Sequence, residues 1–441
     1  MRVRFWGTRG SVPSPGPETL RYGGNTSCVG VRTDDGTSLV LDCGTGARKL
    51  GLALAQDGPT NVHLLVGHTH ADHIQGLPFF MPAFVPGSEL TVYGSPSINR
   101  DFPSALGGQM DYTYFPVPLQ DLPASLRFVE LGEEQFSIGD VCIRTQHLNH
   151  TAPCIGFRVE VGGACLVYAS DHEQHVPSIW RPDRAPDQYD AKALLHPGDR
   201  RHVEFLRGAD LLIHDAQYLA AEYPQKKGWG HSTVEYVIDV ALAAGVKQLA
   251  LYHHDPTRTD EEIDVIVARA RDYVSETGLA LEVMAAREGA EVELLESTVA
   301  TGTQRTPDGA TVLDHPRILV ADDDPVVTRM LDFVLSQDGC DVVVVGNGAD
   351  AVETAKNGQF QLILIDMQMP RLDGLQAVRA MRADPRLRDV PIVMLTALSD
   401  KEDMIAGFNE GVTDYMTKPF AMPQVRARVR SWLSRSPDVQ R

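Results

Sequence analysis

Residues 62–76 read VHLLVGHTHADHIQG. An apolar run is followed within a few residues by four side chains that can bind a metal: His68, His70, Asp72 and His73. His68 and His70 are two residues apart, so an extended turn directs them the same way, whereas His73 follows Asp72 directly and points toward a second centre. Imidazole nitrogens and a carboxylate suit zinc, with manganese or iron as alternatives. The stretch predicts a strand, a metal-binding turn and a helix start, rather than a histidine-rich surface turn that binds nothing.

The length and composition of the chain restrict its class. Its 441 residues are too many for one hydrophobic core and indicate two or three domains. No apolar run approaches the roughly 20 residues that span a bilayer, and the N-terminal sequence MRVRFWGTRG has no signal-peptide pattern. The six cysteines show no C-x-x-C spacing, so neither a zinc-thiolate site nor a disulfide framework is indicated. We therefore expect a cytoplasmic protein that does not enter a membrane.

The charge balance bears on the kind of substrate. The formal net charge is −19, and residues 1–315 alone hold 41 Asp and Glu against 25 Lys and Arg. Binding of a long polyanion depends on Lys and Arg side chains that neutralise its phosphates. The balance therefore disfavours extended nucleic acid, but it allows a short phosphodiester to reach a locally positive metal centre.

Two kinds of pattern divide the chain. Residues 1–296 mix short β-runs, Gly-rich turns and helical segments. Residues 297–315 are small, polar and without periodicity, which is typical of a linker. Residues 316–436 alternate five β-runs with five helical segments, a pattern that predicts a doubly wound parallel sheet. We therefore expect two α/β domains, over 1–296 and 316–436, joined by the linker.

Further candidate ligands follow β-runs of the first domain. His150 follows one in QHLNHTAPCIGF, and Asp171 follows another in LVYASDHE. His253 and His254 compete as ligands after a third, in LALYHHDP. Sites on layered α/β folds gather at such strand ends, and a two-metal hydrolase needs several ligands plus an open position for water. Asp42, at the end of another β-run, is either a hydrogen-bond partner that orients the histidine turn or a plain turn residue.

Taken in order, these motifs resemble those of the metallo-β-lactamase superfamily, in the branch that contains ribonuclease Z and related phosphodiesterases. The resemblance covers about the first 300 residues and rests on HTHADH at 68–73, NHTAPCIGF at 149–157, YASD at 168–171, LIHDA at 212–216, GHST at 230–233 and LYH at 251–253. It implies a four-layer αβ/βα sandwich with two divalent metal ions at the edge between its two sheets.

The resemblance also implies a role for each candidate residue. One ion would take His68, His70 and His150, the other Asp72, His73 and His253, with Asp171 between them and His254 only a neighbour. His231 in GHST matches a position near the leaving group, where a histidine can protonate the leaving oxygen. The alternative for His231 is that it simply precedes the helix that begins at Ser232. Asp72 would help to position the nucleophile as well as bind metal.

Two departures from the family pattern guide the expected function. The sequence between Gly156 and Asp171 is too short for the Gly/Pro-rich arm with which ribonuclease Z grips transfer RNA, and flavodiiron-type members have Glu where His70 stands. We therefore expect a metal-dependent phosphodiesterase acting on a small phosphodiester, such as a cyclic nucleotide or a short oligonucleotide. The alternatives are a ribonuclease-Z-like RNA endonuclease, a thioester or lactone hydrolase on the same fold, and a non-enzymatic adaptor controlled by phosphorylation.

Residues 316–436 resemble a response-regulator receiver domain, which implies a flavodoxin-like five-stranded sheet. Asp366, at the end of the third β-run in LILIDMQMPRLDG, would accept a phosphoryl group from a sensor histidine kinase or a phosphotransfer protein. The remaining matches are the Mg²⁺-binding set Asp322, Asp323, Asp366 and the Gln368 carbonyl, and the switch residues Thr396, Tyr415 and Lys418. Phosphorylation would then control the hydrolase, through access to its cleft or through a homodimer.

Overall fold

The computed structural model describes residues 1–96, 100–175, 196–294, 316–388, 390–397 and 412–418, together with Val425, Val429, Trp432 and Leu433. The chain divides into two compact units, Met1–Ala300 and Thr301–Arg441. The predicted linker, residues 297–315, lies outside the described residues. Within the described part, no helix combines the length and apolarity needed to cross a membrane.

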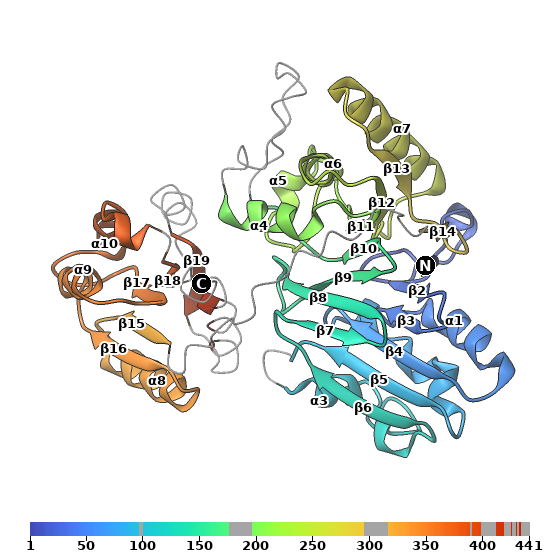
Figure 1. The fold of residues 1–441 in the computed structure, drawn as a ribbon, viewed down its shortest axis with the longest axis horizontal. Helices are drawn as coiled ribbons and strands as arrows, with labels where there is room; N and C mark the ends of the chain where they lie inside the picture. Colours follow the sequence, from blue (N-terminus) through green and yellow to red (C-terminus); the bar gives the residue numbers. More distant parts are fainter. Residues whose placement is uncertain are drawn as a thin grey trace. The chain divides into compact units, whose positions relative to one another are not determined.

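Two seven-stranded sheets form the centre of the first unit (Figure 1). The first sheet has the order β14-β1-β2-β3-β4-β5-β6, with strands β1 (Arg2–Gly7), β2 (Cys28–Arg32), β3 (Ser38–Leu41), β4 (Asn61–Val66), β5 (Glu89–Gly94), β6 (Ser125–Glu130) and β14 (Glu291–Glu293). The second has the order β13-β12-β11-β10-β9-β8-β7, with strands β7 (Gln135–Ile138), β8 (Val141–His147), β9 (Ile155–Val161), β10 (Ala164–Ala169), β11 (Leu211–Asp215), β12 (Gln248–Tyr252) and β13 (Glu282–Ala285). Strands β3 to β6 run parallel to one another, and so do β10 to β13.

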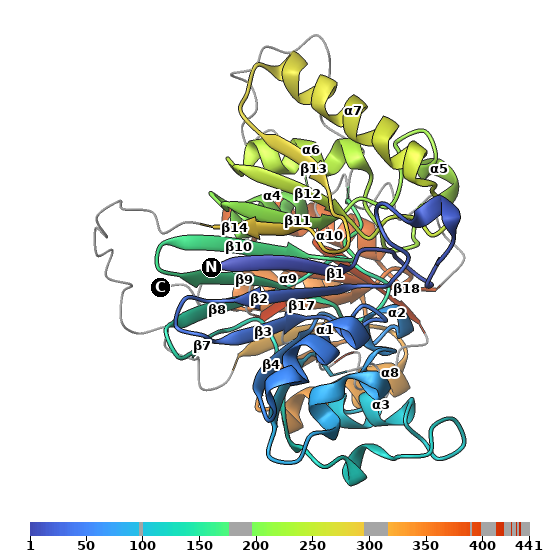
Figure 2. The same ribbon diagram turned by 90° about the vertical axis from the view of Figure 1, so that its right-hand side faces the viewer.

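Apolar side chains hold the two sheets face to face. Phe5, Leu41, Phe157 and Tyr252 are fully buried in one cluster that draws on strands of both sheets. Helices cover the outer faces (Figure 2): α1 (Ala47–Leu54) and α3 (Phe102–Gly108) pack on the first sheet, and α4 (Pro197–Leu206), α6 (Val234–Ala243) and α7 (Asp260–Thr277) on the second. Each sheet therefore buries both of its faces, which gives the predicted four-layer αβ/βα sandwich.

The second unit confirms the predicted doubly wound sheet. Its five strands run parallel in the order β16-β15-β17-β18-β19: β15 (Arg317–Ala321), β16 (Asp341–Val345), β17 (Leu362–Asp366), β18 (Ile392–Ala397) and β19 (Asp414–Lys418). Helices α8 (Pro325–Gln337), α9 (Gly348–Asn357) and α10 (Gly374–Arg382) follow the first three strands. The two helical segments predicted after β18 and β19 fall mainly outside the described residues.

Candidate dimetal centre

Most polar residues of the candidate centre stand at the carboxyl ends of parallel strands, whereas His150 follows β8, which pairs antiparallel with both of its neighbours. Strand β4 is buried along its apolar residues and gives way to the turn that carries His68 and His70, before the short helix α2 (Ala71–Ile74) begins. Asp171 follows β10, and His253 follows β12 directly. Because parallel strands bring their carboxyl ends to one edge, residues far apart in sequence meet there.

Two groups of potential ligands share one carboxylate. The ligand atoms of His68, His70, His150 and Asp171 lie within 4.8 Å of one another, and so do those of Asp72, His73, Asp171 and His253. In the first group Asp171 Oδ2 lies 3.5 Å from His68 Nε2 and 3.7 Å from His150 Nε2. In the second, Asp171 Oδ1 lies 3.3 Å from His73 Nε2 and 3.1 Å from His253 Nε2. The two oxygens of Asp171 therefore face different groups, as a bridging ligand would.

The donor atoms fit divalent cations. His68 Nε2, His73 Nε2 and Asp171 Oδ1 are buried and have no hydrogen-bond partner among the described residues. An unsatisfied buried polar atom costs about 1–3 kcal/mol, and cations bound at the two groups of donors would remove that cost. Nitrogen and oxygen donors in this mixture suit zinc, manganese or iron. His70 is exposed, so the centre opens to solvent beside this residue.

The ionisation of the histidines agrees with a ligand role. Burial lowers the pKa of His68, and it lowers the pKa of His150 to about 4, so both rings are neutral near pH 7. Burial acts against the charged form of His73 as well, but the carboxylates of Asp171 and Asp72 outweigh it and raise the pKa of His73. Bound cations would take the place of this proton between the carboxylates.

Hydrogen bonds from the surrounding protein orient three of the rings. His73 Nδ1 lies 2.7 Å from Asp42 Oδ2, His150 Nδ1 donates to the Gly230 carbonyl at 2.9 Å, and His253 Nδ1 donates to Gln217 Oε1 at 3.0 Å. Such bonds select the tautomer that leaves the other nitrogen free for a metal. Of the two interpretations of Asp42, the structure therefore supports the orienting partner. Neither Gln217 nor the Gly230 carbonyl has a local signal in the sequence that marks this role.

Backbone strain is concentrated at this centre. Four of the five non-glycine residues with positive φ in the described chain are Ser11 (61°), Asp42 (58°), Asp171 (56°) and His253 (57°). Each such conformation costs on the order of 1–3 kcal/mol and persists only where surrounding contacts impose it. In this conformation Ser11 donates its backbone N–H to Asp72 Oδ2 at 2.7 Å. The fold therefore imposes an unfavourable backbone conformation on these four residues, and this conformation places their side chains or N–H groups at the centre.

Asp42 offers a first test of the orienting contacts. Its carboxylate accepts hydrogen bonds from Gly67 N (2.7 Å) and Tyr168 Oη (2.6 Å) in addition to His73. Asp42→Ala removes the carboxylate, and we expect a metal affinity about 10–100-fold lower, measured by competition with a chromophoric chelator. Ser170→Ala is the matched control, because it removes only the longer 3.3 Å bond to Asp42. Equal affinities of Asp42→Ala and wild type would contradict the orienting role.

His231 forms a buried pair with Asp215, the last residue of β11. Its Nδ1 lies 3.0 Å from Asp215 Oδ2, and its ring stacks on that of His253 at a centroid distance of 4.9 Å. Asp215 also accepts the backbone N–H groups of His172 and Ser232, each at 3.2 Å. Burial disfavours the charged ring, but Asp215 outweighs burial and raises the pKa of His231 to about 9. Asp215 belongs to the LIHDA motif, but nothing in the motif itself predicted its contact with His231.

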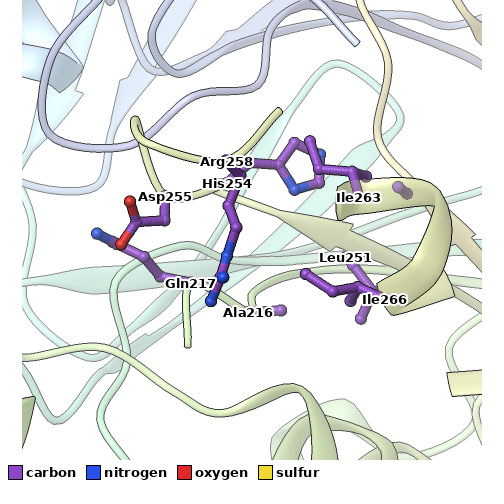
Figure 3. A pocket seen from close by; sticks show the side chains of 9 residues that line it. Ala216, Gln217, Leu251, His254, Asp255, Arg258, Ile263 and Ile266 are labelled. Carbon is purple, nitrogen blue, oxygen red and sulfur yellow. The ribbon is translucent and has the colours of Figure 1, made fainter. Parts of the chain in front are cut away.

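His254 points away from the centre. Its Nε2 donates to the Ala286 carbonyl at 2.9 Å. Its ring lines a separate small pocket together with Asp255, Arg258 and Ile263 (Figure 3). Gln217, which accepts the hydrogen bond from His253 Nδ1, also lines that pocket. The structure thus brings His253, and not His254, to the other candidate ligands.

A third group has the spacing of metal ligands and consists of His172, His175 and Asp199. The nitrogen of His172 that faces this group carries a proton, however, whereas a metal ligand needs a free lone pair. The backbone N–H of Asn149 donates to His172 Nδ1 at 3.2 Å, which places the proton of the neutral ring on Nε2. His172 Nε2 then faces Tyr236 Oη at 3.3 Å, and this hydroxyl donates to Asp199 Oδ1 at 2.8 Å. Since the inward nitrogen carries a proton, this group is a hydrogen-bonded part of the core.

The second unit gathers its own acidic group at the carboxyl ends of β15 and β17. Carboxylate oxygens of Asp322, Asp323 and Asp366 lie within 4.8 Å of one another, and oxygen donors are those that Mg²⁺ prefers. Lys418 Nζ lies 2.7 Å from Asp322 Oδ2 and also contacts Asp366 Oδ1. The Gln368 N–H donates to Asp366 Oδ2 at 2.9 Å.

The remaining predicted switch residues are placed by their backbone alone. Thr396 lies on β18 and Tyr415 on β19, the strand that also carries Lys418. The side chains of Thr396 and Tyr415 lie outside the described residues. Strand pairing places Thr396 opposite Thr417 and Tyr415 opposite Met394.

Comparison with known proteins agrees with both units. The family model for a beta-lactamase superfamily domain matches residues 37–254, and the model for a response regulator receiver domain matches residues 318–430. The chain therefore carries a beta-lactamase superfamily domain followed by a response regulator receiver domain.

Individual relatives match one unit at a time. The DNA-binding response regulator MtrA of Mycolicibacterium smegmatis is 42% identical over 122 residues, which are 28% of this chain and 52% of MtrA. RpaA of Synechocystis, a DNA-binding dual master transcriptional regulator, is 40% identical over 121 residues, or 27% of this chain and 50% of RpaA. The chain thus spans about half the length of these curated relatives.

Two solved structures resemble the first unit. The metallo-beta-lactamase fold protein YhfI from Bacillus subtilis is 20% identical, with a TM-score of 0.46, and the match covers 66% of this chain and 98% of YhfI. The short form of human tRNase Z is also 20% identical with a TM-score of 0.46, over 67% of this chain and all of that protein (100%).

Proposed function

We propose that this chain is a two-component response regulator whose output is a dimetal hydrolase acting on a small phosphodiester, such as a cyclic nucleotide or a short oligonucleotide. The observation that carries the proposal is the carboxylate of Asp171, which is shared by two groups of donors beside the His231–Asp215 pair. The two cations are zinc, with manganese or iron as alternatives, and Mg²⁺ serves the receiver.

The residues of the centre divide the work of hydrolysis. His68, His70, His150, Asp171, Asp72, His73 and His253 would hold two divalent cations, which would supply Lewis-acid stabilisation of the phosphoryl group and lower the pKa of a bound water. Asp72, fixed by the Ser11 N–H at 2.7 Å, orients the nucleophile. His231 holds its Nδ1 proton on Asp215, so a second proton on Nε2 is available for the leaving oxygen. A histidine paired in this way favours a substrate whose leaving oxygen must be protonated.

The receiver would connect this chemistry to a signal. Asp366 is the proposed phosphoacceptor for a sensor histidine kinase or a phosphotransfer protein, because its carboxylate lies among the acidic group and against Lys418. A phosphoryl group there would draw Lys418 onto the new charge and shift the receiver between two states. That shift would alter access to the metal centre or the assembly of a homodimer.

The hydrolase proposal is tested with bis(p-nitrophenyl) phosphate. Metal-loaded His68→Ala is expected to hydrolyse it at least about tenfold more slowly than wild type and to retain less metal per chain by mass spectrometry, because a ligand is lost. His63→Ala is the matched control, since His63 lies on β4 just before the turn and its Nδ1 contacts Tyr93 Oη at 3.3 Å instead. Equal rates for wild type and His68→Ala would dismiss the assignment.

A further inference from the structure

Trp229 is a large apolar side chain left in solvent beside the candidate centre. It is 60% exposed, although its neighbour Gly230 is buried and the next residue is His231. The Gly230 carbonyl accepts the hydrogen bond from His150 Nδ1. A single exposed apolar residue is ordinary on a protein surface, so the way in which Trp229 is held there decides whether it has a role.

The turn that carries Trp229 is fixed on both sides by one carboxylate. Gly228 N donates to Glu173 Oε1 at 2.6 Å, and Gly230 N donates to Glu173 Oε2 at 2.8 Å. Tyr223 Oη, on the short helix α5 (Tyr223–Lys226), donates to the same carboxylate at 2.7 Å. Glu173 is buried and lies two residues after Asp171. The segment that supplies the shared ligand therefore also sets the position of Trp229.

Glycine is required on both sides of the indole. Gly228 and Gly230 have φ values of 85° and 90°, which side-chain-bearing residues rarely adopt. A Cβ on Gly230 would lie 2.3 Å from His150 Nδ1, so the backbone approaches the centre as closely as glycine allows. The local sequence thus restricts the backbone that carries the indole, so the main chain at Trp229 is fixed close to His150.

We infer that Trp229 is a stacking platform for the aromatic base of a nucleotide substrate. The inference rests on the proposed phosphodiesterase function. It adds that one of the two groups esterified to the phosphate is a nucleoside. A phosphodiester at the dimetal centre has two ester arms, and we place Trp229 beside the arm that His231 protonates, because Trp229 directly precedes Gly230 and His231. Every nucleobase presents a π-face to a tryptophan ring, and such stacking is sequence-tolerant. A short nucleotide also agrees with the acidic balance of the chain.

The test compares two substrates whose ester arms are all alkoxides. Thymidine 5′-(methyl phosphate), the thymidine ester, carries a base on an arm that can leave beside His231, and dimethyl phosphate, the methyl ester, carries none. On the full-length, metal-loaded chain, Trp229→Ala is expected to raise KM for the thymidine ester about tenfold or more, with kcat nearly unchanged. The same variant should leave both constants for the methyl ester unchanged, and Trp229→Phe should retain part of the preference. A Trp229→Ala variant with the wild-type ratio of kcat/KM for the two esters would overturn the inference.

A matched control and a second readout separate this inference from the proposed function. Phe333→Ala removes an aromatic side chain of similar exposure, 64%, from α8 of the receiver, and should change neither ester. Calorimetry then compares the binding of thymidine 5′-monophosphate with that of methyl phosphate. If neither ester is hydrolysed but Trp229→Ala abolishes a preference for the nucleotide, the proposed function fails and the base platform stands. If the esters are hydrolysed and wild type shows no preference for the nucleotide, the inferred stacking role of Trp229 fails. Trp229 would then be only a surface residue, such as a contact for a protein partner.

Discussion

His231→Ala is expected to lower kcat about 10²–10⁴-fold for phosphodiesters with alkoxide leaving groups, the range typical of a lost general acid. The physical reason is the leaving oxygen, which must be protonated as the P–O bond breaks when its own pKa is high. His231 is buried against Asp215 and stacks on His253, so it is held beside the proposed ligands. The measurement is steady-state hydrolysis of a dithymidine monophosphate by the metal-loaded proteins.

The same variant provides its own control through the leaving group. p-Nitrophenolate departs without a proton, so bis(p-nitrophenyl) phosphate should lose far less activity in His231→Ala. Equal losses on both substrates would mean that His231 supports the centre structurally, as expected of a residue that merely precedes helix α6. No loss on either substrate would remove it from the mechanism.

The pH dependence follows from the His231–Asp215 pair. In the protein without cations, burial opposes the charged ring, but Asp215 raises the pKa of His231 to about 9. The acid form therefore exists below this pKa and is lost as the pH rises through it. Asp215→Asn removes the negative charge, so the alkaline decline in kcat for the dithymidine substrate should move to lower pH. An unchanged decline in Asp215→Asn would assign it to another group.

Asp366→Asn should abolish phosphorylation of the receiver by acetyl phosphate in the presence of Mg²⁺. An amide oxygen cannot replace the carboxylate as nucleophile, and the substitution also removes one of three acidic side chains that lie within 4.8 Å of one another. Asp373→Asn is the matched control, because Asp373 caps helix α10 through Gln376 N at 2.7 Å and asparagine caps equally well. The readout is the mass increase of one phosphoryl group, which Asp373→Asn should retain. Phosphorylation of Asp366→Asn at the wild-type rate would refute the assignment.

The same pair of variants tests the coupling between the two units. If phosphorylation controls the hydrolase, acetyl phosphate should change the hydrolysis rate of wild type and of Asp373→Asn but leave Asp366→Asn unaffected. A change of either sign would support control, and identical rates with and without acetyl phosphate in wild type would argue against it.

Much of the molecule was predictable because its signals are local. Period-two and period-3.6 apolar patterns, interrupted by glycine, indicated layered α/β units, and both sheets agree with that prediction. The histidine turn at 68–73 was conspicuous because residue types that bind metals stand together directly after an apolar run. The receiver site was predictable for the same reason, since Asp322 directly follows the apolar run ILVA of β15 and Asp366 follows the apolar run LILI of β17.

The partners of those residues were not predictable in the same way. Asp215 and Gln217 are ordinary residues at the end of a strand, and nothing local distinguishes them from the many that only form turns. The Gly230 carbonyl has no side-chain signature at all, yet it accepts the hydrogen bond of His150 from 80 residues away. The choice between His253 and His254 likewise depended on which ring faces Asp72 and which faces Ala286.

By itself, then, the order of amino acids determined the two folds, the chemical kinds of donor and the places along the chain where they occur, because each depends on neighbouring residues. The tertiary structure alone decided that one carboxylate serves both groups of donors and which hydrogen bond orients each ring. It also decided that His231 meets Asp215 and that Glu173 holds the backbone on both sides of the exposed Trp229. These are distances between segments that only the packing of two sheets brings together.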